Sequence, residues 1–213
     1  MSNPWLNVPL AEYEGHMSAA TVRQLDALSD LFADALARTR PASVAILGIA
    51  GGNGLEHIDP SVTTRVAGLD CNPLYLEAVR RRHATRCNLT LHCVDLETDR
   101  PDLEPVDLVH AALVFEHAGA GRCFETAVSL VRPGGALAVV LQLPSDHGHD
   151  VAPTGFASIQ SLKDKFELID PGALRLRLEQ SGLRLAHERH RPVPGGKRLW
   201  MGVFEEDRPS GRQ

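Results

Sequence analysis

Five short strand-like runs, separated by turns and helix-like segments, place the strongest constraint on the fold of this chain. They are residues 42–50, 65–70, 88–95, 106–114 and 136–144. Runs such as ASVAILGIA and ALAVVLQLP are apolar at nearly every position, which is expected where both faces of a strand are buried in a parallel sheet. Strands that alternate with helices in this way predict an α/β fold with a doubly wound, Rossmann-like sheet.

Helical and hairpin patterns complete the predicted architecture. Residues 18–39 place apolar side chains on one half of a helical wheel, with Ser18 or Thr21 as candidate N-cap. Further helices are expected after Asn72, near residues 120–131 and over 171–183, and the segment RPGG is expected to form a turn. Residues 183–192 and 197–206 alternate around VPGG, which predicts an antiparallel hairpin at the C-terminus.

Composition and charge narrow the class of protein. A chain of 213 residues with 43% hydrophobic and 23% charged residues is typical of one globular domain, and no apolar stretch approaches the roughly 18 to 20 residues of a membrane span. The first residues show neither a signal nor a transit pattern, so a cytoplasmic location is expected. The net charge of -5 argues against nucleic acid as partner. The four cysteines lack metal-site spacing, so we expect reduced thiols and no metal.

A glycine-rich turn follows the first strand, in the segment VAILGIAGGNGLEHI at residues 44–58. Such a turn can simply reverse the chain. The sequence, however, predicts that it opens a helix, whose positive end would face the edge of the sheet where α/β folds bind ligands. Asp70 ends the next strand 16 residues after Gly54, where a carboxylate can accept hydrogen bonds from ribose hydroxyls. Together these features predict an adenosine-type ligand.

The dinucleotide fingerprint G-x-G-x-x-G does not fit this turn in any register. Starting at Gly52 places His57 at the third glycine, and starting at Gly48 places Ala50 at the second. No Gly-Lys-Ser/Thr follows, which excludes a phosphate-binding P-loop.

The arrangement instead resembles the class I S-adenosylmethionine-dependent methyltransferases, whose turn reads x-G-x-G-x-G after an acidic residue. Ala50, Gly52 and Gly54 fall on the three glycine positions, and Gly48 replaces the acid. The segments GLDCNPLYLEA, VDL at 94–96, VDLVHAALVFEH, LVRPGGALAVV and the terminal hairpin are similar to later parts of the family pattern. The resemblance covers roughly residues 18–206.

This resemblance implies a seven-stranded methyltransferase fold, mostly parallel with an antiparallel terminal strand. It implies S-adenosyl-L-methionine as cofactor, S-adenosyl-L-homocysteine as product, and methyl transfer to an O or N nucleophile of a small molecule. Asp70 would contact the ribose and Asp95 the adenine amino group. The residues expected to bind the cofactor are Gly48, Ile49, Ala50, Gly51, Gly52, Asn53, Gly54, Asp70, Cys71, Asn72, Asp95, Leu96, Ala111, Ala112 and Glu116.

Two departures from the family pattern keep other functions open. Gly48 leaves the contact to the cofactor's ammonium unassigned, and the Cβ of Ala50 limits how closely the turn can approach a ligand. A nicotinamide-dependent oxidoreductase and an S-adenosylmethionine-binding protein without turnover are therefore the alternatives.

His117 is the candidate catalytic residue, because it follows the fourth strand and an imidazole can act as a general base near neutral pH. The alternative is that His117 only packs against the cofactor or caps a helix. The sequence lacks both an Asn/Asp-Pro-Pro-Tyr/Phe motif and a Pro-Cys nucleophile, which argues against methylation of nucleobases.

Two segments are expected to enclose the substrate. Residues 1–17 form a predicted lid with Tyr13, His16 and Met17 near the methyl group, although this segment is equally suited to cover the sheet or a second copy of the chain, which leaves a homodimer open. Residues 145–170 form an insertion in the methyltransferase domain at 18–206, with Phe156 in its apolar lining. His147, His149 and Asp150 lack a fourth metal ligand, which argues against a metal site. Residues 207–213 are expected to form a flexible tail.

Overall fold

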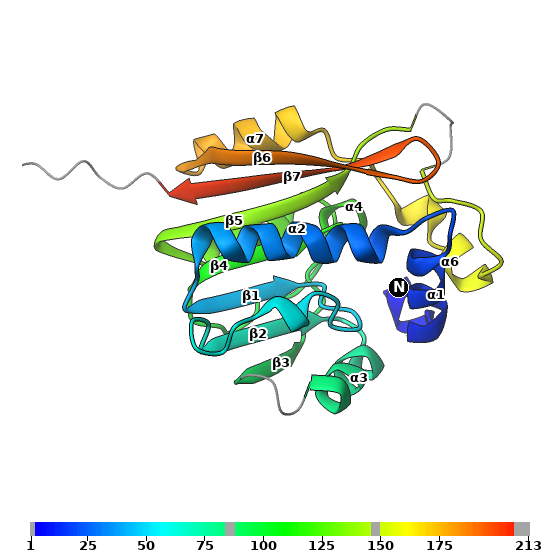
Figure 1. The fold of residues 1–213 in the computed structure, drawn as a ribbon, viewed down its shortest axis with the longest axis horizontal. Helices are drawn as coiled ribbons and strands as arrows, with labels where there is room; N and C mark the ends of the chain where they lie inside the picture. Colours follow the sequence, from blue (N-terminus) through cyan, green and yellow to red (C-terminus); the bar gives the residue numbers. More distant parts are fainter. Residues whose placement is uncertain (1–2, 84–87, 146–149, 207–213) are drawn as a thin grey trace, which may run out of the picture.

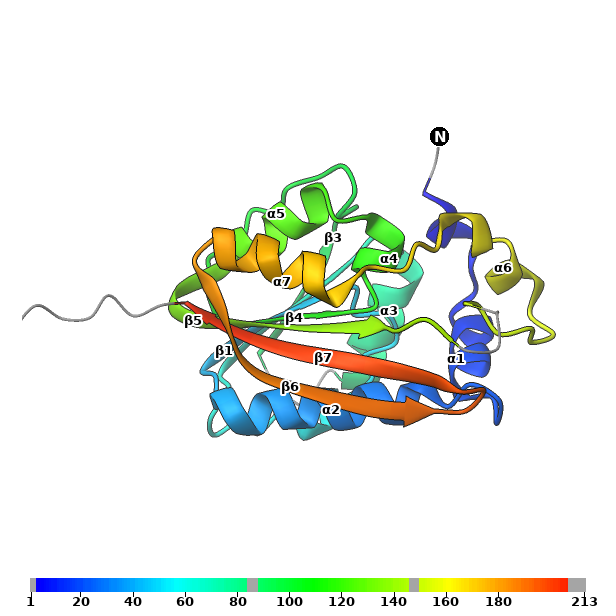
Figure 2. The ribbon, with the colours of Figure 1, turned by 90° about the horizontal axis from the view of Figure 1, so that it is seen from above.

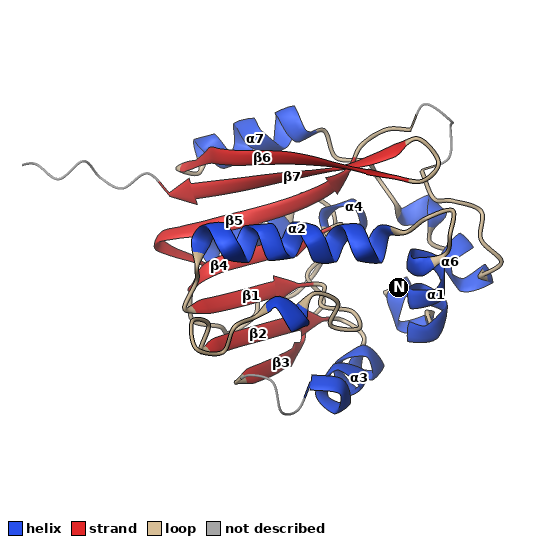
Figure 3. Ribbon diagram, viewed as in Figure 1, coloured by secondary structure: helices blue, strands red, loops and turns tan. Residues whose placement is uncertain are grey.

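A seven-stranded sheet forms the centre of the molecule in the computed structural model, which describes residues 3–83, 88–145 and 150–206 (Figures 1 and 3). Its strand order is β3-β2-β1-β4-β5-β7-β6. The bounds are β1 Ser43–Leu47, β2 Arg65–Asp70, β3 Leu89–Cys93, β4 Val106–Ala112, β5 Val131–Gln142, β6 Leu183–Val193 and β7 Lys197–Glu206. The first five strands pair in parallel, and β7 runs antiparallel to both of its neighbours. The predicted fold class is confirmed.

Helices cover both faces of the sheet (Figure 2). Helices α2 (Gln24–Thr39) and α3 (Pro73–His83) pack on one face, and α5 (Arg122–Ser129) and α7 (Pro171–Gln180) pack on the other. All five residues of β1 are buried, as its continuous apolar pattern predicts for a strand between two helical layers. Burial of apolar side chains in these two layers is the main force that holds the sheet together.

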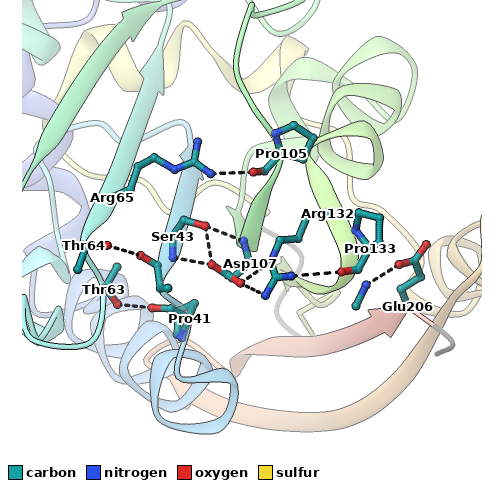
Figure 4. A network of polar contacts seen from close by, with 12 residues as sticks. Pro41, Ser43, Thr63, Thr64, Arg65, Pro105, Asp107, Arg132, Pro133 and Glu206 are labelled. Atoms are coloured by element: carbon teal, nitrogen blue, oxygen red, sulfur yellow. Dashed lines mark hydrogen bonds and ion pairs between the residues drawn. The ribbon is translucent and has the colours of Figure 1, made fainter.

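A polar network ties the amino ends of β1 and β4 together (Figure 4). The Asp107 carboxylate accepts hydrogen bonds from the Ser43 backbone N–H at 2.8 Å and from the Ser43 hydroxyl at 2.6 Å, and it pairs with Arg132. Partial burial acts to raise the pKa of Asp107, but the hydrogen bonds from Ser43 and the charge of Arg132 hold it below its usual value. The carboxylate therefore stays ionised and fixes the strand ends opposite the candidate site.

The predicted helix over residues 18–39 is wrong at its start. Helix α1 spans Leu10–Ser18, and α2 begins only at Gln24. Between them the backbone turns at Ala19–Arg23, where Val22 N–H bonds to the Ala19 carbonyl at 2.8 Å and Arg23 adopts a left-handed φ of 45°. Neither Ser18 nor Thr21 is the N-cap of α2, because Arg23 occupies that position. The break buries Val22 and lets α1 pack on the insertion helix α6 (Ala157–Gln160).

The glycine turn opens no α-helix, which corrects a second prediction. Only the three-residue 3-10 turn η2, Leu55–His57, follows Gly54. Asp59 then accepts hydrogen bonds from the backbone and hydroxyl of Ser61, and Pro60 has no N–H to continue a helix. The turn therefore offers no helix N-terminus to a ligand.

The expected RPGG turn lies inside β5, where the pairing with β4 shifts register. A Cβ at Gly135 would lie 2.9 Å from the carbonyl oxygen of Arg132, so this position requires glycine. The predicted N-cap of α3 is confirmed, because the Asn72 side chain accepts the Leu74 N–H at 3.0 Å.

Two segments lie beyond the carboxyl ends of the parallel strands (Figure 1). One is the N-terminal segment, with the 3-10 turn η1 (Pro4–Asn7) and α1. The other is the insertion, with α6 and the 3-10 turn η3 (Lys163–Lys165), while the short helix α4 (Phe115–Ala118) follows β4. Among the described residues, no helix combines the length and hydrophobicity that crossing a membrane requires.

The glycine turn itself is strained at one position. Gly48, Gly52 and Gly54 have positive φ angles, which glycine adopts without steric cost. Ala50 also has a positive φ, of 46°, and its N–H donates to the Asp70 carboxylate at 2.9 Å. An alanine therefore takes a backbone conformation that suits glycine, held there by its hydrogen bond to Asp70.

Ala50→Gly should stabilise the protein. The left-handed conformation costs a non-glycine residue about 1 to 2 kcal/mol, and glycine loses about 0.5 to 1 kcal/mol more chain entropy on folding, so a net gain of about 0.5 to 1 kcal/mol is expected in urea unfolding. Ala19→Gly is the matched control, because Ala19 has a φ of −50° and glycine should destabilise there. Equal effects of the two substitutions would contradict strain at Ala50.

Candidate functional site

Asp70, the last residue of β2, organises the edge of the sheet where the glycine turn lies. One carboxylate oxygen accepts the Ala50 N–H, and the other accepts the Asn72 N–H at 2.9 Å. Asp70 is only 7% exposed to solvent. Burial raises the pKa of Asp70 above its usual value, although both hydrogen bonds act to lower it. Asp70 therefore fixes the turn and the start of α3 from one buried position.

A cavity opens at this edge, between the sheet and the two segments beyond it. Its walls come from the ends of β1, β2, β4 and β5, from the N-terminal segment and from the insertion. The predicted site residues that line it are Gly48, Ala50, Asp70, Cys71, Asp95, Leu96, Ala112, His117, Tyr13, His16 and Met17. Residues from five separate stretches of sequence are thus brought to one cavity, which we call the main cavity.

The other predicted residues lie around the main cavity rather than on it. Ile49, Ala111 and Glu116 are buried in the protein interior, and Asn72 caps α3. Gly51, Gly52 and Asn53 line a second pocket, together with residues of α1 and α3. A Cβ at Gly54 would lie 2.8 Å from the Phe32 ring, and Phe156 packs beside Gly15 of α1.

The N-terminal segment is fastened to the residues that were predicted to bind the cofactor. The Asn3 amide donates to Asp95 at 2.9 Å, and the Asn72 amide donates to the Trp5 carbonyl at 2.9 Å. Tyr75 donates its hydroxyl to the Val8 carbonyl at 3.0 Å. These bonds hold the segment across the main cavity, as a lid would lie.

Helix α1 adds contacts on two sides of the main cavity. Glu14 pairs with Arg82 of α3, which also donates to the Gly51 carbonyl at 3.2 Å. On the insertion side, the Ser158 hydroxyl donates to Glu12 at 2.5 Å, and His16 Nδ1 lies 2.6 Å from the Thr154 hydroxyl. The helix therefore bridges the glycine turn and the insertion.

His117 lies in an aromatic wall of the main cavity. Its ring packs edge-on against Trp5 and Phe166, with ring centroids 4.8 and 5.2 Å apart. Burial lowers the pKa of His117 to about 4, so the ring is neutral at pH 7. Its Nδ1 is buried without a hydrogen-bond partner among the described residues.

A polar group at the end of β5 was missed by the sequence analysis. The Gln24 amide donates to Gln142 at 2.9 Å, and Gln142 and Lys197 both donate to the Asp150 carbonyl, at 2.7 and 2.6 Å. Gln142, a polar residue at the end of the apolar run ALAVVLQ, was the available signal. No sequence signal pointed to Lys197, because its position depends on the pairing of β7 with β5, which are distant in the sequence.

No cluster of three or more metal-ligating side chains occurs in the described ranges. His147 and His149 of the considered metal motif lie outside the described residues, whereas Asp150 lines the main cavity.

Glu116 is a buried acid directly behind the main cavity. One carboxyl oxygen accepts the Gln142 N–H at 2.8 Å, and the other has no partner within the described part of the chain. Burial raises the pKa of Glu116 to about 7, although this hydrogen bond acts to lower it. Since glutamic acid in an unfolded chain titrates near 4.3, the folded protein keeps a proton that the unfolded chain releases.

Stability should therefore fall as the pH rises from about 4 to about 7, by at most about 1.4 kcal/mol per pH unit from this group. Glu116→Gln should remove this part of the pH dependence, because the amide cannot ionise and still accepts the Gln142 N–H. Urea unfolding across this range tests it, with the exposed Glu104→Gln as control. If both variants keep the wild-type pH dependence, Glu116 is not protonated in the folded state.

Comparisons with known proteins agree with this architecture. The family model described as a methyltransferase domain matches residues 46–137, from β1 into β5. A search of the curated proteins finds no match to the chain.

Solved structures share the fold over most of the chain at low identity. The N-methyltransferase NodS from Bradyrhizobium japonicum WM9, in complex with S-adenosyl-L-homocysteine, has a TM-score of 0.71 and 13% identity, over 97% of this chain and 100% of that one. Magnesium protoporphyrin IX methyltransferase (ChlM) from Synechocystis PCC 6803, with bound S-adenosyl-L-homocysteine, has a TM-score of 0.64 and 13% identity, over 86% and 83%.

The [4+2]-cyclase SpnF also shares the fold, with a TM-score of 0.65 and 12% identity over 85% of this chain and 80% of that one. The family match and the seven-stranded sheet agree with the resemblance stated from the sequence. Residues 46–137 therefore match a methyltransferase-domain family, and the described part of the chain has the Rossmann-like fold of solved methyltransferases.

Proposed function

We propose that this protein transfers a methyl group from S-adenosyl-L-methionine to an O or N nucleophile of a small molecule held in the main cavity. The observation that carries the proposal is the meeting of Asp70, Asp95 and the glycine turn at one cavity beneath the N-terminal segment. The family's cofactor is S-adenosyl-L-methionine, which leaves S-adenosyl-L-homocysteine as the product.

The residues present fit an adenosyl ligand. Asp95 already accepts an N–H donor, the Asn3 amide, and an adenine amino group is a donor of the same kind. Each carboxylate oxygen has two lone pairs, so Asp70 keeps acceptor capacity for ribose hydroxyls beyond its bonds to Ala50 and Asn72. We therefore assign Asp70 to the ribose and Asp95 to the adenine.

The same turn argues against a dinucleotide. A nicotinamide cofactor places its pyrophosphate at a helix N-terminus, and only the three-residue turn η2 follows Gly54. This favours a phosphate-free cofactor and disfavours the oxidoreductase alternative.

The sulfonium of the bound cofactor supplies a methyl group that is already electrophilic. The protein's part is to exclude water and to align the acceptor, and alignment alone can contribute on the order of 7 to 11 kcal/mol. Trp5, His117 and Phe166 form an aromatic wall suited to both tasks. The location of the main cavity beneath the lid favours a small molecule over a polymer as acceptor.

We assign His117 to orienting the acceptor. A ring with a pKa of about 4 is neutral at pH 7 but holds a proton only weakly. His117 is therefore better suited to accept a hydrogen bond from the O–H or N–H of the acceptor than to remove the proton of that group and keep it.

A second function, cofactor binding without methyl transfer, is favoured by one observation. With its pKa lowered to about 4, His117 is a weak general base, and the cyclase SpnF has the same fold. A screen for S-adenosyl-L-homocysteine release with fractions of small-molecule extract distinguishes the two, because turnover in any fraction excludes mere binding.

Calorimetry tests the cofactor assignment directly. S-adenosyl-L-methionine and S-adenosyl-L-homocysteine should bind and NADH should not. Asp70→Ala should weaken S-adenosyl-L-homocysteine binding by about 1 to 3 kcal/mol, because a hydrogen-bonding partner is lost. Asp102→Ala removes an exposed carboxylate away from the cavity and serves as control. Tight NADH binding with no response to either sulfur compound would refute the proposal.

The role of His117 is tested with any acceptor that the screen identifies. His117→Phe should lower kcat by at least about 100-fold with unchanged affinity for S-adenosyl-L-homocysteine, because the ring stays aromatic but accepts no hydrogen bond. His117→Gln should recover part of kcat, since its amide oxygen can accept. A His117→Phe variant with wild-type kcat would mean that His117 only packs.

A further inference from the structure

The end of the main cavity nearest β7 carries a buried cationic group that the proposed methyl transfer does not use. Lys197, Gln142, Gln24 and His16 all line the cavity there, and each is more than nine-tenths buried. We call these four residues the polar end. They come from β7, β5, α2 and α1, so four separate elements converge on it.

Within the described part of the chain, Lys197 leaves hydrogen-bonding capacity unused. Its ammonium group carries three N–H donors, and one of them bonds to the Asp150 carbonyl at 2.6 Å. That carbonyl also accepts from Gln142, so both of its lone pairs are used. Within the described ranges no carboxylate lies within ion-pairing distance of Lys197.

A buried cation without a charged partner is costly unless a ligand completes it. Burial lowers the pKa of Lys197, while the charge of Asp150 acts to raise it. The pKa of His16 is also lowered, first by burial and then by the charge of Lys197, so the two side chains are electrostatically coupled and His16 is not a counter-ion. The Asp150 carboxylate is exposed and lies beyond ion-pairing distance, so an anion from outside the chain would supply the close negative charge that Lys197 lacks among the described residues.

Lys197 and the two carboxylates assigned to adenosine lie on different strands of the sheet. Asp70 and Asp95 lie at the ends of β2 and β3, whereas Lys197 lies on β7. In the sheet order, β2 and β7 are four strand positions apart, which corresponds to roughly 19 Å at about 4.8 Å per step. The polar end therefore lies well away from the residues assigned to adenosine.

Between these ends the wall is largely apolar. Leu113, Val114, Ile159, Leu162 and Phe166 line it. A ligand that reaches the polar end through this part needs an apolar body.

Building on the proposed methyl transfer, we propose that the acceptor is a small carboxylic acid with an apolar body, whose carboxylate is held by Lys197 at the polar end. One ammonium group balances one negative charge, which favours a carboxylate over a phosphate dianion. Lys197 is thus a specificity-determining residue.

Binding of two matched probes tests this in the presence of saturating S-adenosyl-L-homocysteine. Phenylacetate and phenylacetamide have nearly the same shape and differ in charge. NMR titration of the full chain should show phenylacetate binding at least tenfold more tightly than the amide. Lys197→Met should abolish the difference, and Lys197→Arg should retain it. Lys163→Met, which removes an exposed lysine outside the cavity, should change nothing.

Affinity for S-adenosyl-L-homocysteine, measured first for each variant, separates the two proposals. Absence of that binding in the wild type refutes the proposed function. With it intact, phenylacetate that binds no more tightly than the amide, or not at all, overturns the carboxylate site. A preference for phenylacetate that survives in folded Lys197→Met also overturns the carboxylate site. If that variant keeps the preference but loses affinity for S-adenosyl-L-homocysteine, Lys197 is assigned to the cofactor instead. The wild-type and Lys197→Arg measurements decide the matter if Lys197→Met does not fold.

Discussion

The hydrogen bonds of one buried carboxylate, that of Asp70, underlie the geometry of the whole candidate site. Through Ala50 it holds the strained turn after β1, and through Asn72 it sets the start of α3. Asn72 and Tyr75 in turn hold the N-terminal segment through the carbonyls of Trp5 and Val8. A single acid at the end of β2 thus connects the turn, a helix and the lid, in addition to its assigned ribose contact.

The opposite ends of the sheet serve different purposes. At the amino ends, Ser43, Asp107 and Arg132 form a closed polar network that ties β1 to β4. At the carboxyl ends, His117 Nδ1 and Glu116 Oε2 are buried without partners in the described part of the chain. Satisfied polar groups stabilise a fold, whereas unsatisfied ones cost free energy and are retained where function uses them. This contrast is a physical reason to place the chemistry at the carboxyl ends.

The sequence alone predicted those parts of the structure that depend on local pattern. The apolar run 65–70 gave the bounds of β2, and the residues around VPGG gave the hairpin. The break at Ala19–Arg23 was missed because no glycine or proline marks it, and it depends on α1 packing against the insertion. A helix was wrongly predicted after Gly54 because residues 55–58 are compatible with a helix, and the effect of Pro60 was underestimated.

Within the site, the residues that a strand-and-turn motif positions were found, including Asp70, Asp95 and the glycine turn. Lys197 and Gln24 were not, because their meeting with Gln142 depends on tertiary packing of distant segments. Sequence patterns therefore predict the cavity residues at strand ends and in the glycine turn better than those that tertiary packing brings together.

The bridging position of α1 has a kinetic consequence. The helix is tied to α3 by Glu14 and Arg82, and to the insertion by Glu12 and His16. Because contacts lie on both sides of the helix, α1 detaches only when both sets of contacts break. A molecule whose exit requires α1 to detach has a residence time set by the local unfolding free energy of this nine-residue helix, independently of the reactivity beneath it.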